Sequence, residues 1–178
     1  MEYAIGLLFD EVTENRFNNI IRQTALKGIS YMLDNQIAPH ITIAGISTEH
    51  PQSIIDLIDN NVFNFNSGDI FWATIGVFIP QVIFAAPVLN EYLHNFNIRI
   101  NELLKTVGSS ENNRFYLPYN WIPHTTIALK MSLHELRLAF DVIMSEFKAF
   151  GGTTDRLILV PGDPSLEVIK TWMLPHLL

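Results

Sequence analysis

Two histidines in this chain of 178 residues stand in nearly identical surroundings. The segment Pro-His-Ile-Thr-Ile-Ala contains His40, and the segment Pro-His-Thr-Thr-Ile-Ala contains His124. The two segments are identical at five of six positions. At average residue frequencies, a repeat this close arises by chance in about one sequence in a hundred. Either segment alone could be ordinary strand sequence rich in β-branched residues, but the pair indicates an internal duplication.

The His-x-Thr pattern suits phosphoryl chemistry when it lies on a strand. Alternate strand residues share a face, so His40 and Thr42 lie about 7 Å apart along one face, as do His124 and Thr126. One imidazole can take a proton from water while its protonated partner donates to a leaving oxygen. The threonine hydroxyls can donate to phosphoryl oxygens. Two such strands side by side about a pseudo-twofold axis would form a phosphate-sized site that requires no metal.

Alternating strand and helix patterns must position these motifs. Strands are predicted at residues 3–9, 39–46, 69–78, 81–85, 121–130, 155–160 and 166–174. Helices are predicted at residues 13–26, 51–59, 90–107 and 132–147, the last with the capping-box spacing of Ser132 and Glu135. A hairpin is expected near Pro80, an exposed loop at 109–113, and turns at 151–152 and 161–164.

The paired motifs and the order of elements resemble the two-histidine (2H) phosphoesterase superfamily, which includes 2′-5′ RNA ligase-like and cyclic phosphodiesterase proteins. The resemblance covers essentially the whole chain. It implies an α+β, bilobal fold with residues 1–178 as a single domain, in which two antiparallel sheets face a central cleft and helices lie outside. It also implies catalytic roles for His40, Thr42, His124 and Thr126.

Three further residues are candidates for substrate binding. Some members of the superfamily carry an arginine directly after the alanine of the second motif, where this chain has Leu129 and then Lys130. Lys130 shares strand parity with His124 and could replace that arginine; the alternative is a solvated lysine at the strand end, as for Arg156. Tyr119 and Trp121 could stack on a nucleobase, or they could serve core packing or a lid.

No metal or cofactor is expected. The other histidines, at positions 50, 94, 134 and 176, show no metal-binding spacing, and carboxylates do not cluster near them. Neither a GxGxxG nor a GK[ST] phosphate loop occurs, so nucleotide cofactors are not predicted. The chain contains no cysteine, which removes disulfides and thiol catalysis.

Composition narrows the class of partner. The net charge of −7 repels long nucleic acids, and a hydrophobic fraction of 48% with 16% charged residues predicts a chain that folds throughout. The longest apolar run, residues 70–88, is interrupted by prolines and polar residues, and the N-terminus lacks the features of a signal peptide. A cytoplasmic protein without a membrane segment is therefore expected.

These observations favour a metal-independent phosphoesterase that opens a 2′,3′-cyclic nucleotide or an ADP-ribose cyclic phosphate, or cleaves a 2′-5′ linkage. Its substrate would be a small nucleotide or a short RNA end. The resemblance suggests that His124 activates water and that His40 protonates the leaving oxygen, although the residues alone leave this assignment open. Two alternatives remain, namely a non-catalytic binding module for a phosphorylated nucleotide and a 2′-5′ RNA ligase. The sequence does not indicate an oligomeric state.

Overall fold

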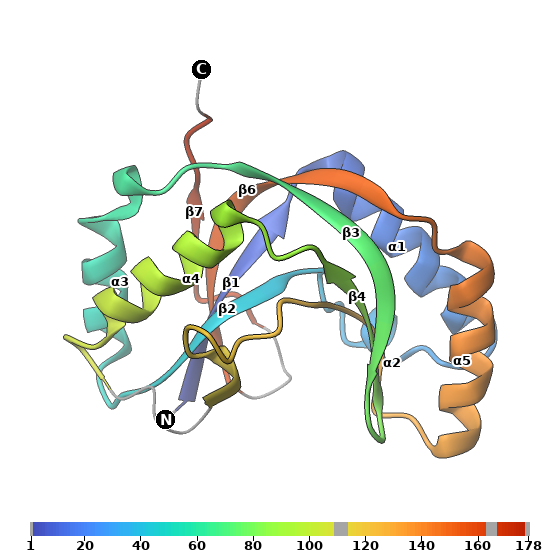
Figure 1. The fold of residues 1–178 in the computed structure, drawn as a ribbon. Coiled ribbons are helices and arrows are strands. Elements are labelled where there is room, and N and C mark those ends of the chain that lie inside the picture. The colour runs from blue at the N-terminus through green and yellow to red at the C-terminus, as the bar shows by residue number, and fades with distance from the viewer. Residues whose placement is uncertain (1, 109–113, 163–166, 177–178) are drawn as a thin grey trace.

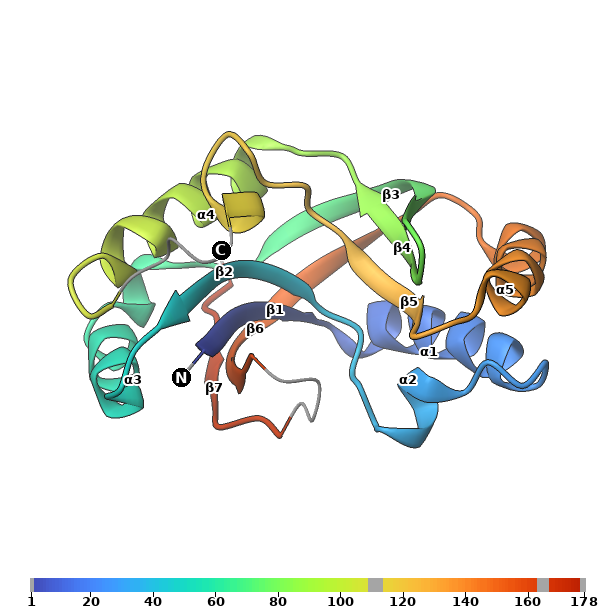
Figure 2. The same cartoon turned by 90° about the horizontal axis from the view of Figure 1, so that it is seen from below.

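The computed structural model describes residues 2–108, 114–162 and 167–176. These residues form one antiparallel sheet of seven strands and five α-helices (Figures 1 and 2). The strands are β1 (Glu2–Phe9), β2 (Ile41–Ser47), β3 (Gly68–Phe78), β4 (Val82–Pro87), β5 (Thr125–Leu129), β6 (Phe150–Pro161) and β7 (Lys170–Met173). The helices are α1 (Glu11–Ala25), α2 (Tyr31–Asp34), α3 (Pro51–Asp59), α4 (Glu91–Leu104) and α5 (Leu133–Glu146), with short 3-10 helices η1 (Val62–Asn64) and η2 (Arg114–Tyr116).

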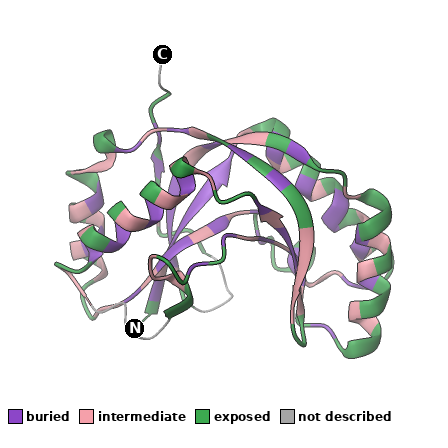
Figure 3. Cartoon of the chain, in the orientation of Figure 1, coloured by how far each residue is buried: buried purple, intermediate pink, exposed green. Residues whose placement is uncertain are grey.

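The strands follow the order β1-β2-β5-β4-β3-β6-β7, and β1 also pairs with β6. Six strands therefore form a closed ring of pairings, and β7 lies outside it on β6. Helices α3 and α4 lie at one end of the molecule, and α1 and α5 lie at the other end (Figures 1 and 2). The buried residues concentrate on the strands and on the helix faces that meet them (Figure 3).

The sequence predicted two sheets, whereas the structure has one. The reason lies in the two longest strands, β3 with 11 residues and β6 with 12. The first part of β6 pairs with β3 and the later part pairs with β1, with Thr154 opposite both Gly68 and Phe9. Because β6 runs through both halves of the molecule, its hydrogen bonds join what would otherwise be separate sheets.

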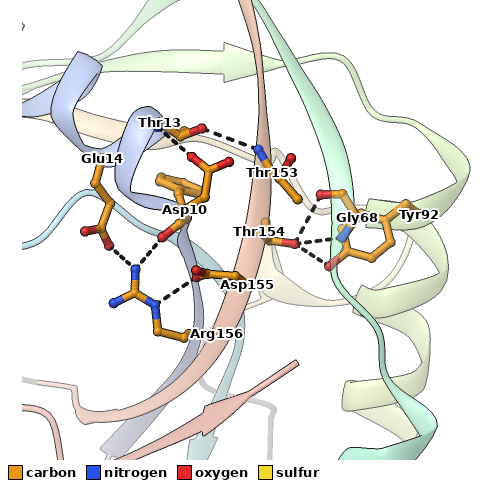
Figure 4. Close-up of polar contacts among 10 residues, drawn as sticks. Asp10, Thr13, Glu14, Gly68, Tyr92, Thr153, Thr154, Asp155 and Arg156 are labelled. Carbon is orange, nitrogen blue, oxygen red and sulfur yellow. Dashed lines mark hydrogen bonds and ion pairs between the residues drawn. The ribbon is translucent and has the colours of Figure 1, made fainter. Parts of the chain in front are cut away.

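Polar side chains fix this junction (Figure 4). The buried Thr154 hydroxyl lies 2.6 Å from the Tyr92 hydroxyl and accepts a hydrogen bond from the Gly68 amide. Nearby, Arg156 forms ion pairs with Glu14 at 2.7 Å and Asp155 at 2.8 Å, and it donates to the Phe9 carbonyl. Arg156 thus ties α1 to the sheet and is not simply a solvated cation.

The turn predicted at residues 151–152 is wrong, because Gly151 and Gly152 lie within β6 opposite Phe71 and Ile70. A Cβ on Gly152 would lie 2.1 Å from the Thr13 hydroxyl oxygen at the start of α1. Glycine is therefore present here for a close approach between strand and helix rather than for a turn.

Most other predicted elements are confirmed, with boundaries that move by a few residues. Ser132 and Glu135 form the predicted capping box, and β3 and β4 form the predicted hairpin. The last strand covers only Lys170–Met173, and α2, η1 and η2 were not predicted. The loop predicted at 109–113 and part of the turn predicted at 161–164 lie outside the described residues. Within the described residues, no helix has the length and apolarity needed to span a membrane.

Candidate functional site

The two motif strands are neighbours in the sheet. Strands β2 and β5 pair antiparallel through Ile41 and Thr125, which directly follow His40 and His124. Extending that register by one residue in each direction places His40 opposite Thr126 and Thr42 opposite His124. The four predicted residues therefore surround the pair of Ile41 and Thr125, and the histidine of each motif lies opposite the threonine of the other.

Burial along the motifs follows the expected two-residue period. Ile41 and Thr125 are completely buried, whereas both histidines, Thr42 and Thr126 are partly exposed. The partly exposed residues lie on the same face of the sheet, opposite the face that the two buried residues occupy. The predicted sharing of a face by histidine and threonine is confirmed for both motifs.

Each motif strand has an irregularity at the same position. Against β1, the register of β2 shifts so that Ile43 is left without a partner, and against β4 the register of β5 shifts at Ile127. Such bulges re-aim the neighbouring side chains and often lie beside functional sites. Both bulges come directly after the threonine of a motif.

Side chains from outside the strand hold the backbone of β2 at its bulge. The Trp121 indole donates to the Thr42 carbonyl at 3.0 Å, and the Asn97 amide donates to the Ile43 carbonyl at 2.8 Å. The Asn97 amide also donates to the Tyr116 carbonyl at 2.9 Å, which links η2 to this strand. These contacts restrict the position of Thr42.

Both imidazoles are oriented by the same hydrogen bond. His40 Nδ1 lies 2.8 Å from the Ala38 carbonyl oxygen, and His124 Nδ1 lies 2.8 Å from the Ile122 carbonyl oxygen. Because a carbonyl oxygen only accepts, Nδ1 must carry the hydrogen in each ring. The other nitrogen, Nε2, is then left to accept a proton when the ring is neutral and to donate one when it is charged.

Burial lowers the pKa of both histidines below the ordinary value of 6.5, because desolvation disfavours the charged ring. In each case the bond to the backbone carbonyl offsets part of this effect. The pKa of His124 is lowered further by positive charge on His40. The pair therefore resists double protonation.

The two rings have different neighbours. The His124 imidazole meets the rings of Phe78 and Phe84 edge to face, with centroid distances of 4.9 and 5.3 Å. The His40 ring lies against Gly6, where an added Cβ would lie 3.5 Å from His40 Cδ2. Of these contacts, only Gly6 has a signal in the sequence, because a glycine inside an apolar strand suggests close approach.

Tyr116 is a further neighbour of Thr42. Burial raises the pKa of its phenol, and a hydrogen bond with the Thr42 side chain offsets part of that rise. Asn97 and Asn101 both donate to its backbone carbonyl. Tyr116 lies close to Tyr119 and Trp121 in the sequence, but its pairing with Thr42 has no local sequence signal.

The three predicted substrate-binding residues lie in different settings. Trp121 is buried and supports Thr42, which leaves no open indole face for stacking. Tyr119 is 84% exposed, and its ring contacts His94. Lys130 follows β5, and its Nζ donates to the Tyr31 hydroxyl at 2.8 Å. Across the described residues, no group of three histidine or carboxylate side chains is placed to hold a metal ion.

Comparisons with known proteins identify solved structures that share this fold. No family model and no curated protein sequence matches the chain. Usb1 from Kluyveromyces marxianus matches in structure with a TM-score of 0.54 and 10% identity, over 98% of this chain and 97% of the Usb1 chain. A crystal structure described as a phosphoesterase matches with a TM-score of 0.56 and 10% identity, over 98% of both chains. The chain therefore shares its fold with a phosphoesterase of known structure.

Proposed function

We propose that this protein is a phosphoesterase that cleaves a phosphodiester bond with His40 and His124 as the acid and base. The observation that carries the proposal is the pairing of the two motifs about Ile41 and Thr125, together with the matching Nδ1 hydrogen bonds. That arrangement leaves the Nε2 atoms of both rings available for proton transfer. The shared fold with a phosphoesterase is in keeping with this chemistry.

A 2′,3′-cyclic phosphodiester suits the site, because its opening needs one proton removed and one supplied. A base takes a proton from water, the water oxygen forms a bond to phosphorus, and the bond from phosphorus to one ribose oxygen breaks. An acid then protonates that leaving oxygen, and the product is a phosphomonoester. The Thr42 and Thr126 hydroxyls donate to the non-bridging oxygens, where charge develops in the transition state. These steps need no metal ion.

We assign the base to His124 and the acid to His40. The resemblance to cyclic phosphodiesterases suggests that the proton is on His40, and His124 is then the neutral ring because a charge on one imidazole lowers the pKa of the other. His40 Nε2 then holds the proton that the leaving oxygen requires.

The substrate is proposed to be a small nucleotide or a short RNA end. Net charge of −7 opposes binding of a long polyanion, and Lys130, which directly follows β5, is the proposed cation for the phosphate. Tyr119, which is largely exposed, is the aromatic candidate for stacking on a base.

The test is hydrolysis of 2′,3′-cyclic nucleotides, ADP-ribose cyclic phosphate and 2′-5′ oligoadenylates with a chelator present. Wild type should turn over at least one of them, and His40→Ala and His124→Ala should each abolish that turnover. Lys130→Ala should raise KM only. Binding of these compounds without turnover would instead favour a binding module, and joining of RNA ends would favour a ligase.

The roles of the two histidines can be separated with an activated diester. Nitrophenolate leaves without protonation, so a nitrophenyl phosphodiester needs the base but not the acid. His40→Ala should retain most activity on this compound, whereas His124→Ala should not. The reverse pattern would exchange the two roles.

A further inference from the structure

The two motif strands differ in the residue that lies opposite each threonine on the adjoining strand. Gly6 of β1 pairs with Thr42, and Phe84 of β4 pairs with Thr126. Both residues come directly after the register shift of their strand, so Gly6 and Phe84 hold corresponding positions. One half of the site therefore has no side chain where the other half has a phenyl ring.

That ring is part of a small aromatic group around His124. The rings of Phe78 and Phe84 stack with their centroids 4.2 Å apart. Both rings contact the imidazole of His124 in edge-to-face geometry. Aromatic rings favour this arrangement, which restricts rotation of the imidazole about its side-chain bonds. At the corresponding position beside His40, Gly6 carries no side chain, and a Cβ there would lie 3.5 Å from His40 Cδ2 and 3.3 Å from Ile158 Cγ1.

Gly76 provides the space that the Phe84 ring occupies. The two residues face each other across β3 and β4, and a Cβ on Gly76 would lie 2.5 Å from Phe84 Cζ and 2.8 Å from Cε2. A ring that covers a cross-strand glycine in this way is fixed by the sheet itself. Any side chain at position 76 would push Phe84 away from its present place.

We propose that Phe84, seated over Gly76 and stacked on Phe78, is a positioning residue that holds His124, and that Gly6 leaves His40 without an equivalent contact. This inference rests on the proposed function, because it explains how two similar motifs take unequal parts in one reaction. A fixed ring suits a base that must meet water at one angle, and a freer ring suits an acid that must follow a departing oxygen.

The titration of His124 depends on few groups. The charge of His40, which directly precedes β2, acts on the His124 imidazole. Strands β3 and β4 contact that imidazole through Phe78 and Phe84, which carry no charge. Removing the Phe84 ring would admit water, so the pKa of His124 should move up toward 6.5, and the pKa of His40 should change less, through the charge of His124 alone.

Proton NMR of the imidazole C2–H signals, recorded against pH, tests this directly. The signals are assigned by their loss in His40→Gln and His124→Gln. Phe84→Leu and Gly76→Ala should both shift the titration of His124 selectively, and Gly6→Ala, as the matched control, should affect His40 instead. An unchanged titration of His124 in Phe84→Leu would overturn the inference.

A double-mutant cycle tests the link between Gly76 and Phe84. If Gly76 acts by making room for the ring, Gly76→Ala should have little further effect once Phe84 is leucine. Equal effects of Gly76→Ala in both backgrounds would contradict that link. Should Gly76→Ala fail to fold, Phe78→Leu tests the same aromatic group from its other member.

Turnover measurements complete the test. Phe84→Leu should lower kcat by about 10- to 100-fold with little change in KM, because misplacing a reacting group by even 1 Å has effects of this size. The NMR titration requires no substrate. A selective shift of His124 in a protein without turnover would therefore refute the proposed function and leave the positioning role standing, and turnover with no selective shift would do the reverse.

Discussion

At the level of single residues, the one position where the two motifs differ has a physical explanation. Ile41 and Thr125 correspond and are both fully buried, yet only one carries a hydroxyl. The Trp72 indole donates to the Thr125 hydroxyl oxygen at 3.1 Å inside the core. Trp72 also contacts the rings of Phe9, Phe17 and Phe150, so its indole has no access to water. An isoleucine at position 125 would leave the indole N–H without this acceptor.

Thr125→Val should therefore destabilise the protein although it preserves shape. We expect a loss of about 1 to 3 kcal/mol in the free energy of unfolding, which is the usual cost of a buried unpaired donor. Thr125→Ser keeps the hydroxyl and is the matched control, with a smaller loss from its missing methyl group. Urea unfolding of the three proteins measures both values, and equal stability of Thr125→Val and wild type would contradict the explanation.

The two histidines should make stability depend on pH. Their pKa values in the folded protein lie below 6.5, so the unfolded chain binds protons more readily as the pH falls through that value. Stability should be unaffected well above pH 6.5 and should decline below it by at most about 1.4 kcal/mol per group for each pH unit, until the folded histidines also titrate. The double variant His40→Gln/His124→Gln should show a flatter profile in chemical unfolding than wild type. A parallel profile would refute the lowered pKa values.

At the level of elements, the bulge in β2 connects the fold to the site. The Thr42 carbonyl at this bulge accepts from Trp121, and the adjoining Ile43 carbonyl accepts from Asn97. These side chains supply hydrogen bonds that β1 does not, and they fix the direction in which Thr42 points.

Replacing Trp121 by phenylalanine should remove the donor and keep most of the packing. We expect a stability loss of about 1 kcal/mol, typical of one hydrogen bond, and a fall in kcat of about tenfold as Thr42 loses its orientation. Trp172→Phe is the matched control, because this indole donates to Asp59 and β7 lies outside the ring of strands. It should lose similar stability and retain kcat; a similar fall in kcat for both variants would point to a general effect of destabilisation.

The sequence predicts the helices and strands better than the irregularities and contacts where they meet. Periodicity located α1, α4 and α5, and the Ser132 and Glu135 capping box marked where α5 begins. The bulges at Ile43 and Ile127 interrupt the alternation only at Ala44 and Ala128, which are buried although strict alternation places them on the site face, and alanine is too small to mark this change in the sequence. Gly151 and Gly152 read as a turn because their true partner, Thr13, lies far away in the chain.

The candidate site was predictable to the same degree. The repeat itself identified His40, Thr42, His124 and Thr126, because four residues of two types at matched spacing carry their own signal. The surrounding residues carry no such signal. Phe78 and Phe84 look like ordinary core positions of a hairpin, and the pairing of Tyr116 with Thr42 depends on a fold that no local pattern contains.

At the level of the whole molecule, the net charge of −7 acts on any anionic substrate before it reaches the site. Salt screens this repulsion over a distance of about 10 Å at 0.1 M ionic strength. KM for a cyclic nucleotide should therefore fall as ionic strength rises from about 0.01 to 0.1 M, while kcat stays constant. Steady-state kinetics at constant pH measures both, and a KM that rises with salt would mean that local cations such as Lys130 dominate.

The ring of strand pairings closes between β2 and β5 through Ile41 and Thr125 alone, whereas β1 and β6 pair over most of β1. A closed circle of paired strands separates most easily where two neighbours share the fewest residue pairs. Here that place is between β2 and β5, beside the two histidines. Separation of this one residue pair would move acid and base apart without breaking any other pairing in the sheet. We expect thermal opening between β2 and β5 to change the gap in which a phosphate would sit, and amide exchange at Ile41 and Thr125 should report this opening.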